Sequence, residues 1–193
     1  FTPGQFLMYI INEKIRRAYS IASTPGGEIE LFIDLRPGGP ASGFFKQVQS
    51  GTICSFLAPF GIFSFKKTSL EKVFFAGSTG IAPFRSMIKD YLENSKEVLN
   101  KAPITLFFGS HRAEDLFILS EFQELAVKFP NFKFVPVSGL PDQSWKGKVG
   151  HVYSSFFEDN TEFSNKEFYI CGSPDMVTLC KEELLKHGVD PKF

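Results

Sequence analysis

Residues 73–83, with the sequence VFFAGSTGIAP, constrain the fold more than any other stretch of this chain. The first four residues form a short apolar run, which is typical of a parallel strand covered on both faces. Gly77 and Gly80 then permit a sharp turn and a close backbone approach, and Pro83 suits the first turn of a following helix. Backbone N–H groups at such a helix start favour a diphosphate, but the spacing is not the Rossmann G-x-G-x-x-G, and the same turn also occurs as a purely structural element.

The 193 residues show two successive patterns, which predict two domains, 1–68 and 69–193. The first pattern alternates apolar and polar residues between Gly- and Pro-rich turns, which predicts a small antiparallel barrel or sandwich. Its expected elements are strands at 6–11, 18–22, 28–35 and 52–57 and a short helix at 42–49 capped by Ser42. The second pattern alternates strands with helices, which predicts an α/β domain with a parallel sheet. Its expected elements are strands at 72–76, 104–108, 132–137 and 168–171 and helices at 81–94, 114–129 and 175–187.

Composition argues against several classes of partner and cofactor. Basic and acidic residues number 21 each, so no net charge attracts nucleic acid or an anionic membrane. The longest apolar run, at 6–11, is far shorter than the ~20 residues that span a bilayer. The three cysteines are an odd number without a C-x-x-C pair, which argues against a disulfide scaffold or a metal centre. They favour a reducing, cytoplasmic setting.

A cation and an aromatic residue lie close together in the RAYS segment, residues 17–20. Arg17 and Tyr19 are two positions apart in a predicted strand, so their side chains should face the same side of the sheet. Such a pair can hold a phosphate and a flat ring together. It would also suit a solvated edge strand, and the segment alone does not decide between the two.

Six segments, taken together and in order, resemble the ferredoxin–NADP reductase-like family. The segments of the first half are RAYS at 17–20, GPAS at 39–42 and PFGIF at 59–63, which resemble R-x-Y-[ST], G-x-x-S and G-P-x-G-x-F. Those of the second half are GSTGIAP at 77–83, SWKGKVGHV at 144–152 and CGSPDMV at 171–177, which resemble G-G-T-G-x-x-P, W-x-G-x-x-G-x-V and C-G-P-P-x-M-V. The chain departs from the family mildly at Ala58, Ser78 and Ser173, which replace two glycines and a proline.

The resemblance implies an FAD-binding β-barrel joined to a nicotinamide-nucleotide domain, with the two cofactors meeting in a cleft. Hydride would pass from nicotinamide C4 to flavin N5, so no side chain has to act as a nucleophile or a general base. Electrons would then leave singly to a redox protein of the ferredoxin, oxygenase or haem type. NADPH-preferring members carry an arginine where this chain has Gly139, which favours NADH, although Arg112 is close enough in sequence to compensate.

The same resemblance assigns cofactor contacts. Arg17 would contact the FAD pyrophosphate, and Tyr19 would pack on the isoalloxazine or ribityl group. Ser20 and Cys171 would lie nearest the transferred hydride, as residues that position the two rings. The other expected FAD contacts are Phe32, Ile33, Asp34, Gly39, Ala41 and Ser42. The other expected nicotinamide-nucleotide contacts are Gly77, Thr79, Gly80, Gly109, Ser110, Arg112, Ser138, Gly172 and Pro174.

Three other functions remain open from the sequence. One is a flavin reductase that releases reduced flavin, another is an electron-transfer subunit without nicotinamide chemistry, and the third is a binding module with a degenerate site. The resemblance also implies an N-terminally incomplete barrel with further strands before residue 1, and a last strand after 188–193. An iron–sulfur or globin domain could be fused at either end.

Overall fold

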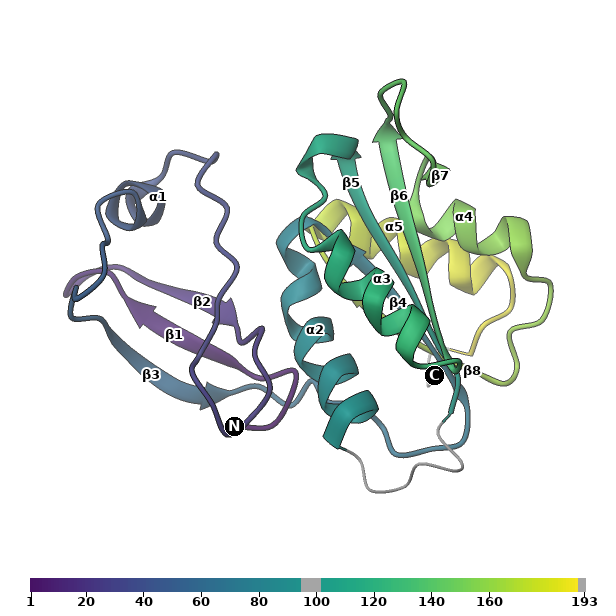
Figure 1. The fold of residues 1–193 in the computed structure, drawn as a ribbon, viewed down its shortest axis with the longest axis horizontal. Coiled ribbons are helices and arrows are strands. Elements are labelled where there is room, and N and C mark those ends of the chain that lie inside the picture. The colour runs from purple at the N-terminus through teal and green to yellow at the C-terminus, as the bar shows by residue number, and fades with distance from the viewer. Residues whose placement is uncertain (95–101, 191–193) are drawn as a thin grey trace. The chain divides into compact units, whose positions relative to one another are not determined.

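The computed structural model describes residues 1–94 and 102–190, which form two compact units (Figure 1). One unit contains Phe1–Lys66 and Ala82–Asn94, and the other contains Lys67–Ile81 and the described residues from 102 onward. The predicted approach to a further strand at 188–193 falls partly outside the described residues, which end at 190.

The first unit is built on a three-stranded antiparallel sheet with strand order β2-β1-β3. The strands are β1 (Phe6–Ile10), β2 (Arg16–Ser20) and β3 (Ser55–Phe60). The short helix α1 (Pro40–Phe45) lies against the sheet face that carries Tyr9, whose ring centroid is 4.8 Å from that of Phe45. Aromatic packing therefore attaches α1 to this face of the sheet.

Helix α2 (Ile81–Lys89) continues as a π-helical turn over Asp90–Asn94, and from Ala82 onward it groups with the first unit. Its Phe84 packs on Phe63 with ring centroids 5.9 Å apart. Its Arg85 donates a 3.0 Å hydrogen bond to the carbonyl of Ala22 and forms an ion pair with Glu30. These contacts bind α2 to the irregular segments that follow β2 and β3.

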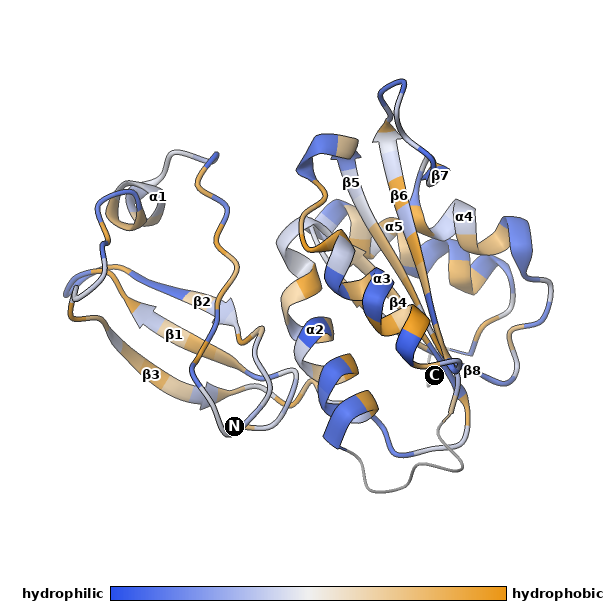
Figure 2. Ribbon diagram, in the orientation of Figure 1, coloured by the Kyte–Doolittle hydropathy of each residue, from blue (hydrophilic) through white to orange (hydrophobic). Residues whose placement is uncertain are grey.

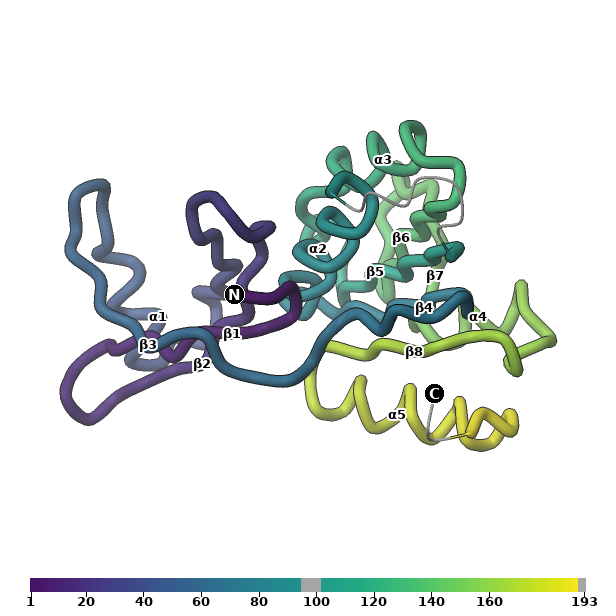
Figure 3. The backbone as a smooth tube through the Cα atoms, turned by 90° about the horizontal axis from the view of Figure 1, so that it is seen from below, coloured from purple at the N-terminus to yellow at the C-terminus, as the bar shows by residue number. Residues whose placement is uncertain are grey.

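The second unit is a five-stranded parallel sheet with strand order β7-β6-β5-β4-β8. The strands are β4 (Glu71–Gly77), β5 (Ile104–Arg112), β6 (Phe132–Leu140), β7 (Lys148–Val149) and β8 (Lys166–Cys171). Helix α3 (Leu119–Lys128) covers one face, and α4 (Val152–Asp159) and α5 (Pro174–Lys186) cover the other (Figures 1 and 3). Two short 3₁₀ turns, Ser78–Gly80 and Ala113–Asp115, follow β4 and β5.

The core of this unit is rich in phenylalanine, and Figure 2 shows hydrophobic residues concentrated on the central strands. The rings of Phe75, Phe107 and Phe156 meet edge to face, with centroids 5.6 to 5.8 Å apart. The predicted apolar strand is confirmed, because residues 73–76 are completely buried. Alternate side chains of this strand therefore fill both helix-covered faces.

The predicted strand at 28–35 is wrong, since among the described residues its only ladder contact is an isolated bridge between Leu31 and Ile21. Pairing begins there, because the Ala22 N–H donates to the Glu30 carbonyl at 2.8 Å. The pairing does not extend further, because side chains form hydrogen bonds with the backbone groups next to the bridge. Ser23 Oγ accepts from the Glu30 N–H, and Arg85 donates to the Ala22 carbonyl.

Three other predictions need correction. The first helix begins at Pro40 with Gly39 as its N-cap, so Ser42 is not the cap. The strand predicted at 52–57 lies at 55–60, and the helix predicted at 114–129 starts only at 119, after Ile118 adopts a left-handed φ of 52°. Strand β7 and helix α4 were not predicted.

Within the described ranges, no helix is long and apolar enough to cross a membrane.

Candidate nucleotide-binding sites

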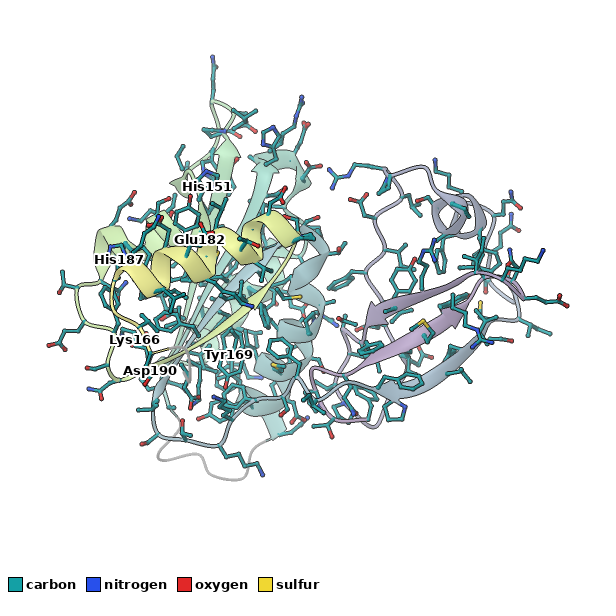
Figure 4. All side chains as sticks on the ribbon, turned by 180° about the vertical axis from the view of Figure 1, so that it is seen from behind. His151, Lys166, Tyr169, Glu182, His187 and Asp190 are labelled. Carbon is teal, nitrogen blue, oxygen red and sulfur yellow. The ribbon has the colours of Figure 1, made fainter. Side chains whose placement is uncertain are left out.

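The carboxyl ends of the parallel strands gather most of the residues predicted for the nicotinamide nucleotide. The strand register places Gly77 opposite Gly109 and Ser110 opposite Ser138. It also places Ala76 opposite Cys171, so that four neighbouring strands contribute to one edge of the sheet. Open α/β sheets bind their ligands at this edge. In Figure 4, His151, the N-cap residue of α4, lies toward this edge of the sheet, and Lys166, the first residue of β8, lies toward the opposite edge.

The turn after β4 lies directly on the end of β8. A Cβ atom on Gly80 would lie 2.3 Å from the carbonyl oxygen of Cys171, which is closer than two such atoms can approach. Only glycine therefore fits at position 80. Ser78 has a φ of 50°, in the left-handed region that glycine adopts freely. This conformation explains why the family pattern has glycine where this chain has serine.

The donor groups at this edge fit a nucleotide with a diphosphate. Helix α2 starts at Ile81, immediately after the turn, and among the described residues no side chain caps the amides of the turn. The Thr79 side chain is half-buried in the same turn. Ser138 Oγ is fully buried and has no hydrogen-bond partner within residues 1–94 and 102–190. Uncapped amides and an unsatisfied hydroxyl are the groups that a bound anion or ribose would satisfy.

Cys171 and the residues after it form the start of α5. Burial raises the pKa of the Cys171 thiol, so this group is protonated and neutral at physiological pH. Gly172 follows it, and Ser173 caps the helix by accepting a hydrogen bond from the Met176 N–H at 3.3 Å. Pro174 occupies the first helical position. A neutral thiol at this strand end suits a group that positions a ring, and does not suit a nucleophile.

Other predicted positions lie on β5 and at its end. A Cβ atom on Gly109 would lie 2.6 Å from Cγ1 of Val152, so glycine allows α4 to pack closely on this strand. Arg112, the last residue of β5, is exposed and forms an ion pair with Glu114 at 3.3 Å.

In the first unit, one face of the sheet carries Arg17, Tyr19 and the packing surface of α1. The register pairs Leu7 with Tyr19 and Tyr9 with Arg17, which confirms that Arg17 and Tyr19 share a face. The Tyr19 ring is edge-on to Phe45 of α1, with centroids 5.5 Å apart. The predicted pyrophosphate turn at 39–42 therefore lies at the start of a helix that packs on this same face.

Electrostatics on this face suit a ligand with a flat ring and a diphosphate. Burial raises the pKa of the Tyr19 phenol, although the nearby charge of Arg17 partly opposes this effect. Tyr19 is therefore a neutral donor at physiological pH. Arg17 is exposed, and its Nη1 donates to the Arg16 carbonyl at 2.8 Å. The other guanidinium donors of Arg17 can contact a phosphate from this position.

The structure places the remaining predicted FAD residues differently. Ser20 follows Tyr19 on β2, and by strand alternation its side chain points to the other face. The guanidinium carbon of Arg85 lies over the ring of Phe32, 5.7 Å from the ring centroid. The Asp34 carboxylate is already paired with Arg36 at 2.8 Å, and hydrogen bonds from Arg36 lower the pKa of this carboxyl. Ile33 lies between them in the irregular segment.

Met176 is a residue of this region that the sequence did not single out. Its side chain lies beside both Gly77 and Gly172. The only sequence signal is that Met176 occupies the methionine of the C-G-P-P-x-M-V pattern, and this pattern does not say what the side chain contacts.

Comparisons with known proteins match the two halves of the chain to two family models. A family model described as "Oxidoreductase NAD-binding domain" matches residues 74–182, more than half of the chain. A second, described as "Oxidoreductase FAD-binding domain", matches residues 1–65. The fold and the matched models define an oxidoreductase that binds FAD and a nicotinamide nucleotide.

Relatives and solved structures specify the family further. The chain is 33% identical to a component of the Na(+)-translocating NADH-quinone reductase of Neisseria gonorrhoeae, over 93% of this chain and 48% of that protein. It is 31% identical to the CDP-6-deoxy-L-threo-D-glycero-4-hexulose-3-dehydrase reductase of Yersinia pestis, over 98% of this chain and 56% of that protein. The crystal structure of the Amycolatopsis cytochrome P450 reductase GcoB matches with a TM-score of 0.89 and 26% identity, over all of this chain and 59% of that chain.

The chain belongs to the ferredoxin–NADP reductase-like family of oxidoreductases. The predicted fold class, an antiparallel FAD-binding β-barrel joined to an α/β nucleotide-binding domain with a parallel sheet, is confirmed. The chain spans about half the length of the curated relatives it matches, 48% of the Neisseria protein and 56% of the Yersinia protein.

Proposed function

We propose that this chain carries the flavin and nicotinamide sites of a reductase that moves hydride from NAD(P)H to FAD and electrons onward to a redox protein. The observation that carries this proposal is that Gly77, Gly109 and Cys171 lie together at one edge of the parallel sheet. The other unit presents Arg17 and Tyr19 on one face of its antiparallel sheet. The two domains proposed to hold FAD and the nicotinamide nucleotide are 1–68 and 69–193. Cys54, Cys171 and Cys180 form no disulfide with one another, which suits the proposed cytoplasmic setting.

Binding and orientation are the tasks of the protein. Bound FAD supplies the redox chemistry, because it accepts a hydride from NAD(P)H and can release the two electrons one at a time. Arg17 would neutralise the pyrophosphate, and the backbone N–H groups after Gly39 would add hydrogen bonds to it. Tyr19 would lie against the flat ring system. Ser20, whose side chain leaves β2 on the other face, would hydrogen-bond to the flavin near N5 from the end of the strand.

The second unit would orient the donor nucleotide. The amides of 78–80 would face its diphosphate, with the Thr79 hydroxyl as an additional donor. Ser138 would bind a ribose, with Ser110 and Gly109 beside it on β5. The neutral thiol of Cys171, with Gly172 and Pro174, would hold the nicotinamide ring without reacting with it.

NADH is the proposed coenzyme. A Cβ atom on Gly139 would lie 3.2 Å from the His111 carbonyl oxygen, so a long side chain is disfavoured at this position. The restricted space at position 139 favours a coenzyme without the 2′-phosphate that an arginine there would bind.

A steady-state assay with cytochrome c as the one-electron acceptor tests this function. Protein reconstituted with FAD and freed of excess flavin should reduce cytochrome c with NADH, and more slowly with NADPH. Activity that requires continuous addition of free FAD would instead indicate a flavin reductase that releases its product. Protein that binds FAD but does not oxidise either coenzyme would indicate an electron-transfer protein without nicotinamide chemistry.

Arg17→Ala is expected to lower FAD affinity without unfolding the protein. The substitution removes a charge-assisted contact to phosphate, worth about 1.5–3 kcal/mol, or about 10- to 150-fold in the dissociation constant. Fluorescence titration with FAD measures the change. Arg16→Ala is the matched control, because Arg16 is an exposed neighbour on the other face of β2. Equal FAD affinity in the wild type and Arg17→Ala would contradict the role of Arg17.

A further inference from the structure

The side chain of Met176 lies between the two glycine turns at the sheet edge. A Cβ atom on Gly77 would lie 2.4 Å from Met176 Sδ, and one on Gly172 would lie 2.6 Å from the same sulfur. The glycine backbones also approach each other, because the Gly172 Cβ position is only 3.3 Å from the Gly77 Cα. One thioether therefore occupies the space that both glycines leave open.

Met176 is itself held firmly. Its N–H donates to Ser173 Oγ at the start of α5, and its side chain packs against the core cluster that includes Phe75 and Cys180. The sulfur thus contacts the end of β4 on one side and the end of β8 on the other. A change at position 176 would remove this contact to both turns without removing any group that contacts the coenzyme.

We propose that Met176 is a positioning residue for the nicotinamide end of the coenzyme, acting through Gly77 and Gly172. This inference rests on the proposed function, which assigns both glycines to the nicotinamide nucleotide. The thioether sets the spacing between the turn that follows β4 and the turn that follows β8. An unbranched, polarizable side chain suits this irregular gap.

The inference predicts a selective defect in Met176→Ala. The limiting rate of flavin reduction at saturating NADH should fall roughly tenfold, because small misplacements of a bound reactant lower its reactivity steeply. In calorimetric titrations, NAD⁺ should bind several-fold more weakly, whereas ADP-ribose, which keeps the diphosphate but lacks nicotinamide, should lose less affinity than NAD⁺. Met176→Leu, a volume-conserving change, should restore both properties. Leu179→Ala, at an exposed position of the same helix, is the matched control.

A compensating pair tests the contact itself. In Gly77→Ala the added methyl group meets Met176 Sδ, and its next neighbour, the Gly172 Cα, lies at an ordinary 3.6 Å. Gly77→Ala should therefore weaken NAD⁺ binding, and Met176→Ala in the same protein should recover part of that loss because it makes room for the methyl group.

Several outcomes would overturn the inference. These are equal losses of NAD⁺ and ADP-ribose affinity in Met176→Ala, no loss of either, or strictly additive effects of the two substitutions. A wild-type protein that binds neither nucleotide would instead contradict the proposed function, and the inference with it.

Discussion

Replacing Glu167 by glutamine is expected to lower the free energy of unfolding by about 3–5 kcal/mol, because it removes the opposite charge from a buried ion pair. Lys72 and Glu167 are paired positions on β4 and β8, with 0% and 3% of their side chains exposed and 2.6 Å between Nζ and Oε2. The carboxylate also accepts hydrogen bonds from Thr68 at 2.9 Å and from the hydroxyl of Tyr169 at 3.2 Å. Chemical denaturation of the wild type and Glu167→Gln measures the difference.

A neighbouring ion pair provides the control. Glu71 and Lys166 pair at the same end of the sheet, where Figure 4 labels Lys166 and Tyr169 on β8. Their side chains are 25% and 14% exposed, so Glu71→Gln should cost less than Glu167→Gln. The double substitution Lys72→Met with Glu167→Leu should be less damaging than either single charge removal. A loss below about 1 kcal/mol in Glu167→Gln would place the pair among weak surface pairs and contradict the expectation.

The pH dependence of this difference has a definite sign. Burial alone would raise the pKa of Glu167, but hydrogen bonds from Lys72 and Thr68 and the charge of Lys72 outweigh it and lower the pKa. A carboxyl with a lowered pKa stabilises the folded state above its unfolded pKa, and this contribution disappears as the pH falls through the folded value. The stability difference between the wild type and Glu167→Gln should therefore shrink as the solution becomes acidic.

Gly80→Ala is expected to weaken nicotinamide-nucleotide binding about 10- to 150-fold, because displacement of the turn removes an amide hydrogen bond to the diphosphate, worth about 1.5–3 kcal/mol. The new methyl group would meet backbone atoms of Cys171 and Gly172 at 2.3 to 2.8 Å, and backbone cannot move aside as a side chain can. The turn after β4 must therefore shift. Titration with NAD⁺ measures the loss, and retained FAD binding shows that the first unit still folds.

Gly27→Ala is the matched control for this substitution, because a Cβ atom there has no neighbour within 4 Å among the described residues and Gly27 has no positive φ. Its nucleotide affinity should equal that of the wild type. If Gly80→Ala also binds NAD⁺ as the wild type does, the turn at 78–80 is not part of the coenzyme site.

The sequence predicts those elements whose signals are local. The apolar run 73–76, the two glycines after it and the helix that follows were all recognisable, because each depends on residues close together in the chain. The irregular segment 28–35 was not, because its pairing is interrupted by Arg85, which lies 55 residues beyond Glu30. Helix α4 was missed because it is only eight residues long and follows a two-residue strand.

The same distinction between local and long-range signals applies to the candidate site. Parallel strands bring their carboxyl ends to one edge, so the alignment of Gly77 with Gly109 follows from the strand pattern. The pairing of Lys72 with Glu167 joins residues 95 positions apart, and neither residue type predicts its burial. The position of Met176 between two turns likewise depends on packing that only the folded unit defines.

The central claim is that FAD bound to this protein takes hydride from a nicotinamide nucleotide bound to the same chain. Its most direct test is anaerobic rapid mixing of the FAD-loaded protein with NADH, and with NADH deuterated at C4, while the visible flavin absorbance is followed. We predict that the flavin bleaches in one turnover and that it bleaches more slowly with the deuterated coenzyme. A bound flavin that keeps its absorbance in the presence of saturating NADH and NADPH would contradict the claim.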